Sequence, residues 1–164
     1  MLNGIHDHWK VSSRMSSVRI REAIETDVID IQLCAREAYL KYVQRMDREP
    51  APMNADFSAQ IARGYVSVAT SPSGLVGYVV AYPEGTQFML ENVAVLPGCS
   101  GQGIGKLLIE HVENTAKLAG YKTVELYTNE AMTENITMYP KLGYVEVGRK
   151  SDSGFNRVFF SKQL

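Results

Sequence analysis

Cysteine, net charge and long apolar runs are all scarce in this sequence of 164 residues. Its two cysteines, Cys34 and Cys99, are too few for a four-cysteine metal site or a disulfide framework, which predicts a reducing, cytoplasmic environment. A net charge of -1 argues against a nucleic-acid-binding or membrane-binding surface. No apolar run approaches the roughly 18 residues of a membrane span, and residues 1–17 lack the apolar block of a signal peptide.

The composition is that of an ordinary globular domain. Hydrophobic residues make up 45% of the chain and charged residues 21%, which is enough apolar material to bury a core. A chain of this length fits one domain. Residues 1–17 show little periodicity and end in a serine-rich patch. We therefore expect a poorly ordered N-terminal extension over residues 1–17 and a single domain over residues 18–164.

Hydrophobic periodicity predicts strands and helices in the order β-α-α-β-β-β-α-β-α-β-β. Apolar runs indicate strands at 18–23, 65–69, 75–82, 88–96, 124–127, 144–148 and 157–161. Helical spacing indicates helices at 27–46, 55–63, 104–119 and 131–142. Thr26 is the expected N-cap of the first helix, and Leu108 and Leu118 are expected on the buried face of the third. This order favours a mixed α/β sheet.

A glycine-rich turn before the helix at 104–119 is the most informative segment. Glycines stand at positions 98, 101, 103 and 105, and Lys106 adds a positive charge beside the first helical turn. Free N–H groups at a helix N-terminus bind anions such as phosphate, and glycine lets the backbone approach the anion closely. The alternative is a plain strand-to-helix turn without a ligand. The density of glycines favours phosphate binding.

Two common nucleotide-binding patterns fail at this turn. The triphosphate loop Gly-x-x-x-x-Gly-Lys-Ser/Thr, aligned on Lys106, places Ser100 at its first glycine and Leu107 at the magnesium-binding hydroxyl. The dinucleotide pattern Gly-x-Gly-x-x-Gly, begun at Gly103, requires a glycine where Leu108 stands. A nucleotide-phosphate-binding protein is therefore disfavoured.

The same turn resembles the pyrophosphate loop of the GNAT superfamily, the acyl-CoA-dependent N-acetyltransferases. The family motif Gln/Arg-x-x-Gly-x-Gly/Ala is matched by Gly103-Ile104-Gly105, although Ser100 replaces the leading Gln or Arg. The segment 93–97 resembles the preceding strand, and Tyr139-Pro140-Lys141-Leu142-Gly143-Tyr144 resembles the closing Tyr-x-x-x-Gly-Phe/Tyr element. The resemblance covers residues 18–164. It implies a GNAT fold: one mixed, mostly antiparallel sheet of about seven strands flanked by about four helices.

The resemblance also implies where acetyl-CoA binds. Its pantetheine arm would lie along the strand at Val93, Ala94 and Val95, pairing with backbone groups of Val93 and Val95. Its pyrophosphate would lie on the turn and first helical turn, formed by Gly101, Gln102, Gly103, Ile104, Gly105 and Lys106. No metal is required. From the residues alone, the alternation of Val93 and Val95 in an apolar strand says only that they belong to the core.

Glu91 is the candidate general base, because acetyl transfer requires an amine that has lost its extra proton. A carboxylate between Leu90 and Asn92 interrupts an otherwise apolar strand. This stretch also resembles the Leu-Glu-Asp of spermidine/spermine N-acetyltransferases, and that resemblance implies a base at the glutamate. The alternative is an exposed or salt-bridged glutamate without a catalytic role.

Tyr139 matches the family's tyrosine at the end of the penultimate helix. The resemblance implies that it donates a hydrogen bond or proton to the departing CoA sulfur. A phenol suits this role because its ordinary pKa of about 10 keeps it protonated at neutral pH. The alternative is a core tyrosine. Asn135 lies four residues earlier on the same helical face and is a candidate CoA contact, because Met132 occupies the family's usual asparagine position.

These features predict an enzyme that transfers the acetyl group of acetyl-CoA directly to a primary amine of a small molecule or peptide. The alternative is a non-catalytic acyl-CoA-binding or sensing module, which has no need of both Glu91 and Tyr139. The charged run 45–49 is typical of a solvated helix end near the expected acceptor pocket. We expect no nucleic-acid or membrane partner. The acceptor and homodimer formation stay open, because one fold hosts many acceptors.

Overall fold

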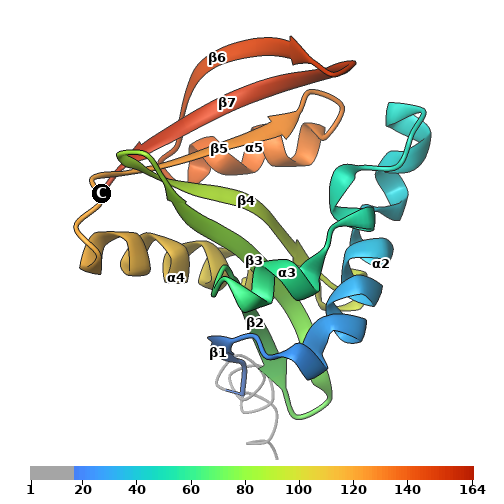
Figure 1. Cartoon of the computed structure of the whole chain (residues 1–164). Helices are drawn as coiled ribbons and strands as arrows, with labels where there is room; N and C mark the ends of the chain where they lie inside the picture. Colours follow the sequence, from blue (N-terminus) through green and yellow to red (C-terminus); the bar gives the residue numbers. More distant parts are fainter. Residues whose placement is uncertain (1–16) are drawn as a thin grey trace, which may run out of the picture.

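The computed structural model describes residues 17–164, so the predicted extension lies outside the described residues apart from Ser17 (Figure 1). Within this range the strands are β1 (Arg19–Glu22), β2 (Val66–Ser71), β3 (Gly74–Glu84), β4 (Gln87–Val95), β5 (Thr123–Asn129), β6 (Val145–Asp152) and β7 (Phe155–Gln163). The α-helices are α2 (Val28–Met46), α3 (Phe57–Ala62), α4 (Ile104–Leu118) and α5 (Thr133–Lys141). The predicted order of elements is confirmed.

The strands form one sheet in the order β1-β2-β3-β4-β5-β7-β6. Neighbouring strands are antiparallel except β4 and β5, which are parallel because the chain crosses through α4 between them. Figure 1 shows β1 at one end of the sheet and the hairpin of β6 and β7 at the other. This is the mixed, mostly antiparallel sheet with four helices that we predicted.

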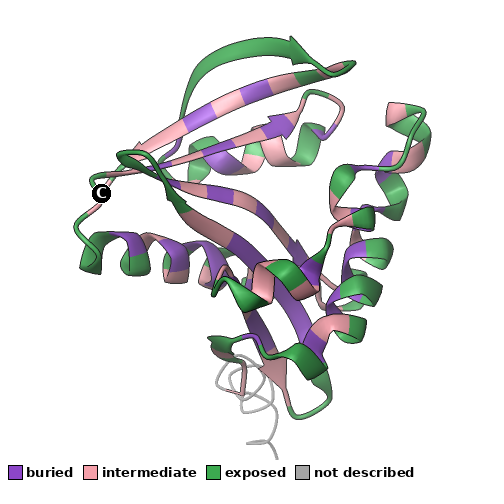
Figure 2. Cartoon of the chain, viewed as in Figure 1, coloured by how far each residue is buried: buried purple, intermediate pink, exposed green. Residues whose placement is uncertain are grey.

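Helices cover both faces of the sheet, and each face has its own hydrophobic core. α4 and α5 pack on one face, where Leu108, Val124 and Phe160 are buried. α2 and α3 pack on the other face, where Ile31, Phe57 and Tyr78 are buried. Figure 2 shows the buried residues concentrated along the strands and on one side of each of the longer helices. The central strands are therefore buried on both faces.

Gly77 in β3 lets α4 approach the sheet closely. A Cβ atom at this position would lie 2.8 Å from the carbonyl oxygen of Ala94 and 3.2 Å from Cδ1 of Leu108. The helix buries Leu108 as expected, but Leu118 is 91% exposed, so the prediction that Leu118 shares the buried face is wrong. Periodicity identifies the apolar face of a helix without showing where the core beneath it ends.

Asp27, rather than the expected Thr26, organises the start of α2. Its carboxylate accepts hydrogen bonds from two guanidinium nitrogens of Arg21 (2.8 and 2.9 Å) and from the N–H of Ile24 (2.8 Å). Asp27 is the residue just before the helix and is buried. The hydrogen bonds from Arg21 hold the pKa of Asp27 below its usual range, in opposition to burial.

Asp27→Asn is expected to lower the free energy of unfolding by about 2 kcal/mol, because hydrogen bonds to charged groups contribute about 1.5–3 kcal/mol. The pKa of Asp27 is lower in the folded state. Its stabilisation is therefore present above about pH 4 and is lost as the pH falls through the folded-state pKa. Urea denaturation at about pH 7 and about pH 3 measures both effects, and the difference in stability between the two proteins should be smaller at the lower pH.

Glu146→Gln is the control for this prediction, because it breaks an exposed ion pair with Arg149 (2.6 Å). Exposed pairs contribute about 0–1 kcal/mol, so its effect at neutral pH should be the smaller one. Equal losses in the two variants would contradict the assigned role of Asp27.

The C-terminal end of α2 reaches across to the second half of the chain and is more than a solvated helix end. Arg45 makes a two-pronged ion pair with Glu134 in α5, with both N···O distances 2.8 Å. These hydrogen bonds lower the pKa of Glu134 to about 2. Arg48 donates to the carbonyl oxygen of Ser153 (3.3 Å) and lies over the ring of Phe155, at the tip of the hairpin of β6 and β7.

No helix within residues 17–164 is both long enough and apolar enough to span a membrane. Over the same residues, no three His, Cys, Asp or Glu side chains gather as metal ligands do. Cys34 is fully buried, and burial raises the pKa of its thiol to about 12. Its thiol is therefore protonated at neutral pH and packs as a small apolar side chain.

Candidate active site

A β-bulge interrupts β4 at Glu91. Val80 of β3 pairs with Asn92, whereas the next residue of β3, Ala81, pairs with Leu90. Glu91 is therefore an extra residue with no partner of its own in β3. Bulges of this kind bend a strand and change the direction of the side chains around them.

The bulge places two consecutive side chains on the same face of the sheet. Leu90 packs into the core on the α4 side, and beyond the bulge Val93 and Val95 pack on that side. Glu91 and Asn92 instead both line a cavity next to α2 and α3. In a regular strand, consecutive side chains point to opposite faces, so a regular β4 would have separated these two polar groups.

β4 and β5 separate just where this bulge occurs. In their parallel pairing, Phe88–Leu90 of β4 lie opposite Val124–Leu126 of β5. The pairing ends there, although β4 continues to Val95. Figure 1 shows the two strands diverging beyond this point. The end of β4 therefore has a strand partner on its β3 side only. On this unpaired stretch, the carbonyl oxygen of Val93 accepts a hydrogen bond from the hydroxyl of Tyr39 in α2 (3.3 Å).

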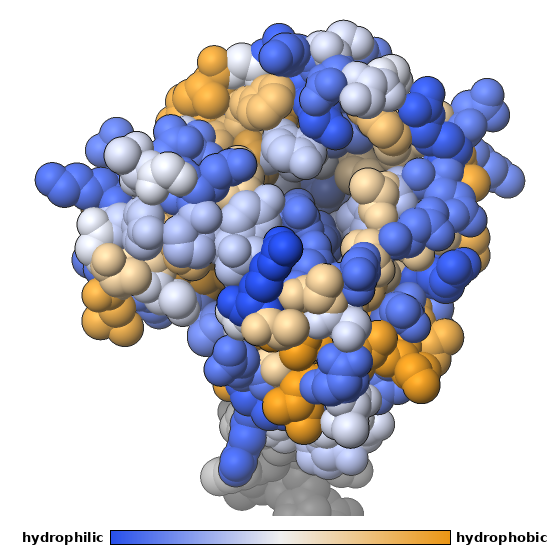
Figure 3. Space-filling model, viewed as in Figure 1, coloured by the Kyte–Doolittle hydropathy of each residue, from blue (hydrophilic) through white to orange (hydrophobic). Residues whose placement is uncertain are grey.

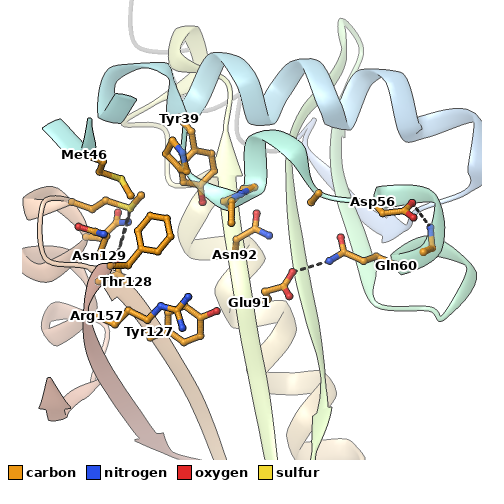
Figure 4. Close-up of a pocket in the computed structure, with 18 of the residues that line it drawn as sticks. Tyr39, Met46, Asp56, Gln60, Glu91, Asn92, Tyr127, Thr128, Asn129 and Arg157 are labelled. Carbon is orange, nitrogen blue, oxygen red and sulfur yellow. Dashed lines mark hydrogen bonds between the residues drawn. The ribbon is translucent and has the colours of Figure 1, made fainter. Parts of the chain in front are cut away.

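A cavity of about 430 Å³ opens beside the diverging strands. Figure 3 shows its opening as a hollow with hydrophilic residues around much of the rim. Figure 4 shows side chains entering it from α2, α3, β4, β5 and β7. The lining residues are Tyr39, Met46, Pro50, Ala51, Pro52, Ala55, Asp56, Ala59, Gln60, Arg63, Glu91, Asn92, Tyr127, Thr128, Asn129, Met132, Asn135, Phe155 and Arg157.

Glu91 lies in the cavity wall, half-buried and without an ionic partner among residues 17–164. Its Oε2 accepts a hydrogen bond from Nε2 of Gln60 (2.8 Å), and its Oε1 accepts one from the hydroxyl of Tyr82 (3.4 Å). Burial, with a contribution from the Glu91 carboxylate, raises the pKa of Tyr82 to about 12, so this phenol remains a donor at neutral pH. The two donors orient a carboxylate that faces the cavity (Figure 4).

Tyr139 lies in the core beside the cavity and not in its wall. It is buried, and its ring packs on Tyr144 and Phe160 with centroid distances of 5.6 and 5.7 Å. Burial raises the pKa of Tyr139, with a smaller contribution from the phenol of Tyr42. Burial likewise raises the pKa of Tyr39, with Tyr139 as the next contributor. The ring of Tyr39 packs on that of Tyr42, with a centroid distance of 6.0 Å, and its hydroxyl reaches the unpaired end of β4.

Asn135 lines the cavity from α5, on the same side as β5. Its amide nitrogen donates to Oγ1 of Thr128 (3.3 Å) and contacts Sδ of Met132 (3.6 Å). The predicted cofactor contact Asn135 and the predicted base Glu91 therefore lie in one cavity, although 44 positions of sequence numbering separate them.

The glycine-rich turn, preceded by a single turn of 3-10 helix at Pro97–Cys99, connects β4 to α4. Gly101 and Gly103 have φ angles of 76° and 80°, in the left-handed region that favours glycine. Gly103 is the N-cap of α4 and has no side chain to cap it, so the first N–H groups of the helix have no acceptor within the helix. Lys106 is exposed and lies 3.9 Å from Glu110. These are the properties of a backbone anion site.

Several residues that line the cavity were not predicted from the sequence. Tyr39, Gln60 and Arg157 come from α2, α3 and β7, and no local pattern distinguishes them from other surface or core residues. Asn92 had a detectable signal, because it is a polar residue in an apolar strand. The sequence analysis gave it no role, and a regular strand would place its side chain on the face opposite Glu91.

The sequence of residues 62–146 matches the family model of the acetyltransferase (GNAT) domain. This match spans just over half of the chain, so the protein belongs to the GNAT acetyltransferases, which are acyl-CoA-dependent. The resemblance inferred from the glycine-rich turn and the closing element is thereby confirmed. No curated protein is significantly similar to the chain.

Solved structures share the fold over nearly the whole chain. The PaiA N-acetyltransferase of Thermoplasma acidophilum, solved with coenzyme A, is 18% identical, with a TM-score of 0.76 over 90% of this chain and 99% of that one. The ribosomal-protein-S18-alanine N-acetyltransferase of Escherichia coli is 17% identical, with a TM-score of 0.73 over 89% and 93%. Ard1 of Thermoplasma volcanium is 16% identical, with a TM-score of 0.73 over 90% and 98%. Identities this low define the fold and not the acceptor.

Proposed function

We propose that the protein transfers the acetyl group of acetyl-CoA directly to a primary amine of a small molecule or peptide. The observation that carries this proposal is the separation of β4 from β5 after Leu90. It opens one strand edge beside a cavity that contains Glu91, and the same strand leads into the glycine-rich turn. A site for an extended thioester, a site for its phosphates and a candidate base thus all adjoin β4.

The residues present fit acetyl-CoA. An extended chain with amide groups pairs well with a free strand edge, and Val93, Ala94 and Val95 supply one. A diphosphate needs backbone N–H donors, and residues 101–106 supply them at the start of α4. In this proposal Asn135 contacts the cofactor near the cavity. The leading Gln or Arg of the family motif is Ser100 here, so the backbone carries more of the phosphate binding.

In the proposed reaction, each of the two candidate catalytic residues takes part in one proton transfer. The amine nitrogen bonds to the thioester carbonyl carbon, and the bond from that carbon to sulfur breaks. Glu91 accepts the proton that the amine loses, directly or through one water molecule. Tyr139 donates a hydrogen bond or proton to the leaving sulfur, and solvent restores any proton lost. Burial raises the pKa of Tyr139, so the phenol is protonated at neutral pH.

Acetyl-CoA is expected to stabilise the protein in a thermal-shift measurement, whereas ATP with magnesium is not. At about 100 times its dissociation constant, a ligand adds about 2.7 kcal/mol to the free energy of unfolding, which raises the Tm by several degrees. Release of CoA thiol in the presence of primary amines then tests transfer. Stabilisation by ATP with magnesium but not by acetyl-CoA would contradict the proposal.

Gly101→Ala and Gly85→Ala form a matched pair for the same measurement. Both glycines have positive φ (76° and 62°), and a Cβ at either position meets nothing within 4 Å. Each substitution should therefore cost about 1–2 kcal/mol of backbone strain. Only Gly101→Ala should also reduce the stabilisation by acetyl-CoA, because Gly85 lies in the turn between β3 and β4. An equal response in both variants would mean that the glycine-rich turn does not contact the cofactor.

A further inference from the structure

The wall of the cavity formed by β4 and α3 presents a carboxylate and, beside it, two buried acceptors that lack donors among residues 17–164. Glu91 contributes a carboxylate, and the side-chain oxygens Oδ1 of Asn92 and Oε1 of Gln60 are buried with no partner among residues 17–164. Asn92 is only 7% exposed. Because Nε2 of Gln60 already donates to Glu91, its other amide atom is an acceptor. Figure 4 shows the three side chains pointing into the same space.

This set of acceptors matches a primary amine. A buried acceptor without a donor costs about 1–3 kcal/mol, so two of them beside the Glu91 carboxylate indicate a ligand that brings several N–H groups. An ammonium group carries three donors and a positive charge that the Glu91 carboxylate stabilises. Transfer of one of its protons to Glu91, and from Glu91 to solvent, leaves the neutral amine that acetyl transfer requires. Glu91 is then again ionised and can accept the second proton as the bond to carbon forms.

The opposite wall presents a cation. The guanidinium of Arg157 in β7 lies over the ring of Tyr127 in β5, with Cζ 4.5 Å from the ring centroid. Its Nη1 donates to Oδ2 of Asp152 (2.8 Å), and no other hydrogen bond to this guanidinium exists within the described part of the chain. The side chain is 24% exposed. Figure 4 shows Arg157 and Tyr127 across the cavity from Gln60, with Glu91 between them.

A guanidinium held over an aromatic ring with donors to spare is a site for an oxyanion. Its planar fork of N–H groups matches a carboxylate or phosphonate, and stacking on Tyr127 reduces the entropy lost on binding. Between the two walls, the cavity surface is largely carbon, from Met46, Pro50, Met132 and Phe155 among others. A volume of about 430 Å³ suits a small molecule.

We infer that the acceptor is a small molecule that carries both a primary amine and an oxyanion, as amino acids and aminophosphonates do. Glu91, Gln60 and Asn92 receive the amine, and Arg157 receives the oxyanion. This inference rests on the proposed function, because it assumes that the cavity holds the acceptor of acetyl transfer.

The test compares amines in pairs that differ only in the oxyanion. Phenylalanine is paired with phenethylamine, lysine with cadaverine, and 6-aminohexanoate with pentylamine. A comparison of aminomethylphosphonate with glycine distinguishes phosphonate from carboxylate. Release of CoA thiol gives kcat and KM for each compound. At least one oxyanion-bearing amine should exceed its partner in kcat/KM by about tenfold or more, which corresponds to about 1.4 kcal/mol.

Arg157→Gln should remove this preference. We expect kcat/KM for the preferred compound to fall by about tenfold or more, mainly through KM, while the matched amine without an oxyanion changes by about twofold at most. Arg157→Lys should restore only part of the preference, since an ammonium lacks the planar fork. Arg149→Gln, an exposed arginine of β6, should change neither substrate.

Asp152→Asn separates oxyanion binding from the stability of the hairpin. This variant breaks the same ion pair as Arg157→Gln but keeps the guanidinium, so it should retain the preference. An equal loss in both variants would assign Arg157 a structural role and overturn the inference.

Two further outcomes would also overturn the inference. One is a wild-type enzyme that acetylates the amines without an oxyanion as well as their partners. The other is stabilisation by acetyl-CoA without acetylation of any compound in the set. Absence of stabilisation by acetyl-CoA is a different result, because it contradicts the proposed function itself.

Discussion

Glu91→Gln is expected to lower kcat for acetyl transfer by about 10²–10⁴-fold, the usual contribution of a general base. The amide keeps the shape of the side chain and can still contact Gln60, but it cannot accept a proton at neutral pH. Stabilisation by acetyl-CoA should stay at the wild-type level, because the cofactor binds along residues 93–95 and 101–106 in our proposal. Steady-state thiol release and thermal shift measure the two effects separately.

Glu125→Gln is the matched control for this substitution. Glu125 is also a half-buried carboxylate in a strand, and it accepts a hydrogen bond from Oγ of Ser161 (2.8 Å), but it does not line the cavity. Its kcat should remain within about twofold of wild type, as expected for a carboxylate that takes no part in the reaction. If Glu91→Gln raises KM and leaves kcat unchanged, Glu91 binds the amine without acting as its base.

Tyr139→Phe is expected to lower kcat by about 10²-fold or more, because the leaving sulfur loses its donor. The folded state should lose little stability. The ring remains packed on Tyr144 and Phe160, and no hydrogen bond of the Tyr139 hydroxyl occurs within residues 17–164. Acetyl thioesters of more acidic thiols should be less affected, because a better leaving group depends less on an acid. Full activity of the variant with acetyl-CoA would mean that Tyr139 only packs in the core and takes no part in the reaction.

Tyr144→Phe removes a second phenol from the same aromatic cluster and serves as the control. The hydroxyl of Tyr144 is buried without a partner among residues 17–164, so its removal should leave stability unchanged or slightly higher. It should also leave kcat unchanged, because the donor to the leaving sulfur in our proposal is Tyr139 and not Tyr144. A loss of activity equal to that of Tyr139→Phe would indicate a shared packing effect and contradict a specific role for the Tyr139 hydroxyl.

The sequence predicted the fold well because the signals of the fold are local. The periodicity around Ile31 and Leu108 identifies helices, and the apolar run after Phe88 identifies β4, without knowledge of what packs against them. The predictions from the sequence are wrong where contacts with another segment of the chain determine the structure. Asp27 replaces Thr26 at the start of α2 because Arg21 lies beside it, and Leu118 is exposed although it continues an apolar face.

The candidate site was predictable only where its residues are contiguous. Gly101 and Gly103 lie in one short turn whose spacing carries the chemistry of phosphate binding. Glu91 was noticeable because a carboxylate interrupts an apolar strand. Gln60 and Arg157 were not, because an amide in a short helix and an arginine in a hairpin strand acquire their role only from the side chains they meet.

By itself, the sequence therefore determined the order of helices and strands, the glycine-rich turn and the family. The tertiary structure decided that Glu91 and Asn92 share one face, that β4 separates from β5, and that Arg157 stands across the cavity from Gln60. The physical reason is that helices and turns are held by contacts within a few residues of the chain. A bulge, a separated strand pair and the composition of a cavity depend instead on register and packing between distant segments.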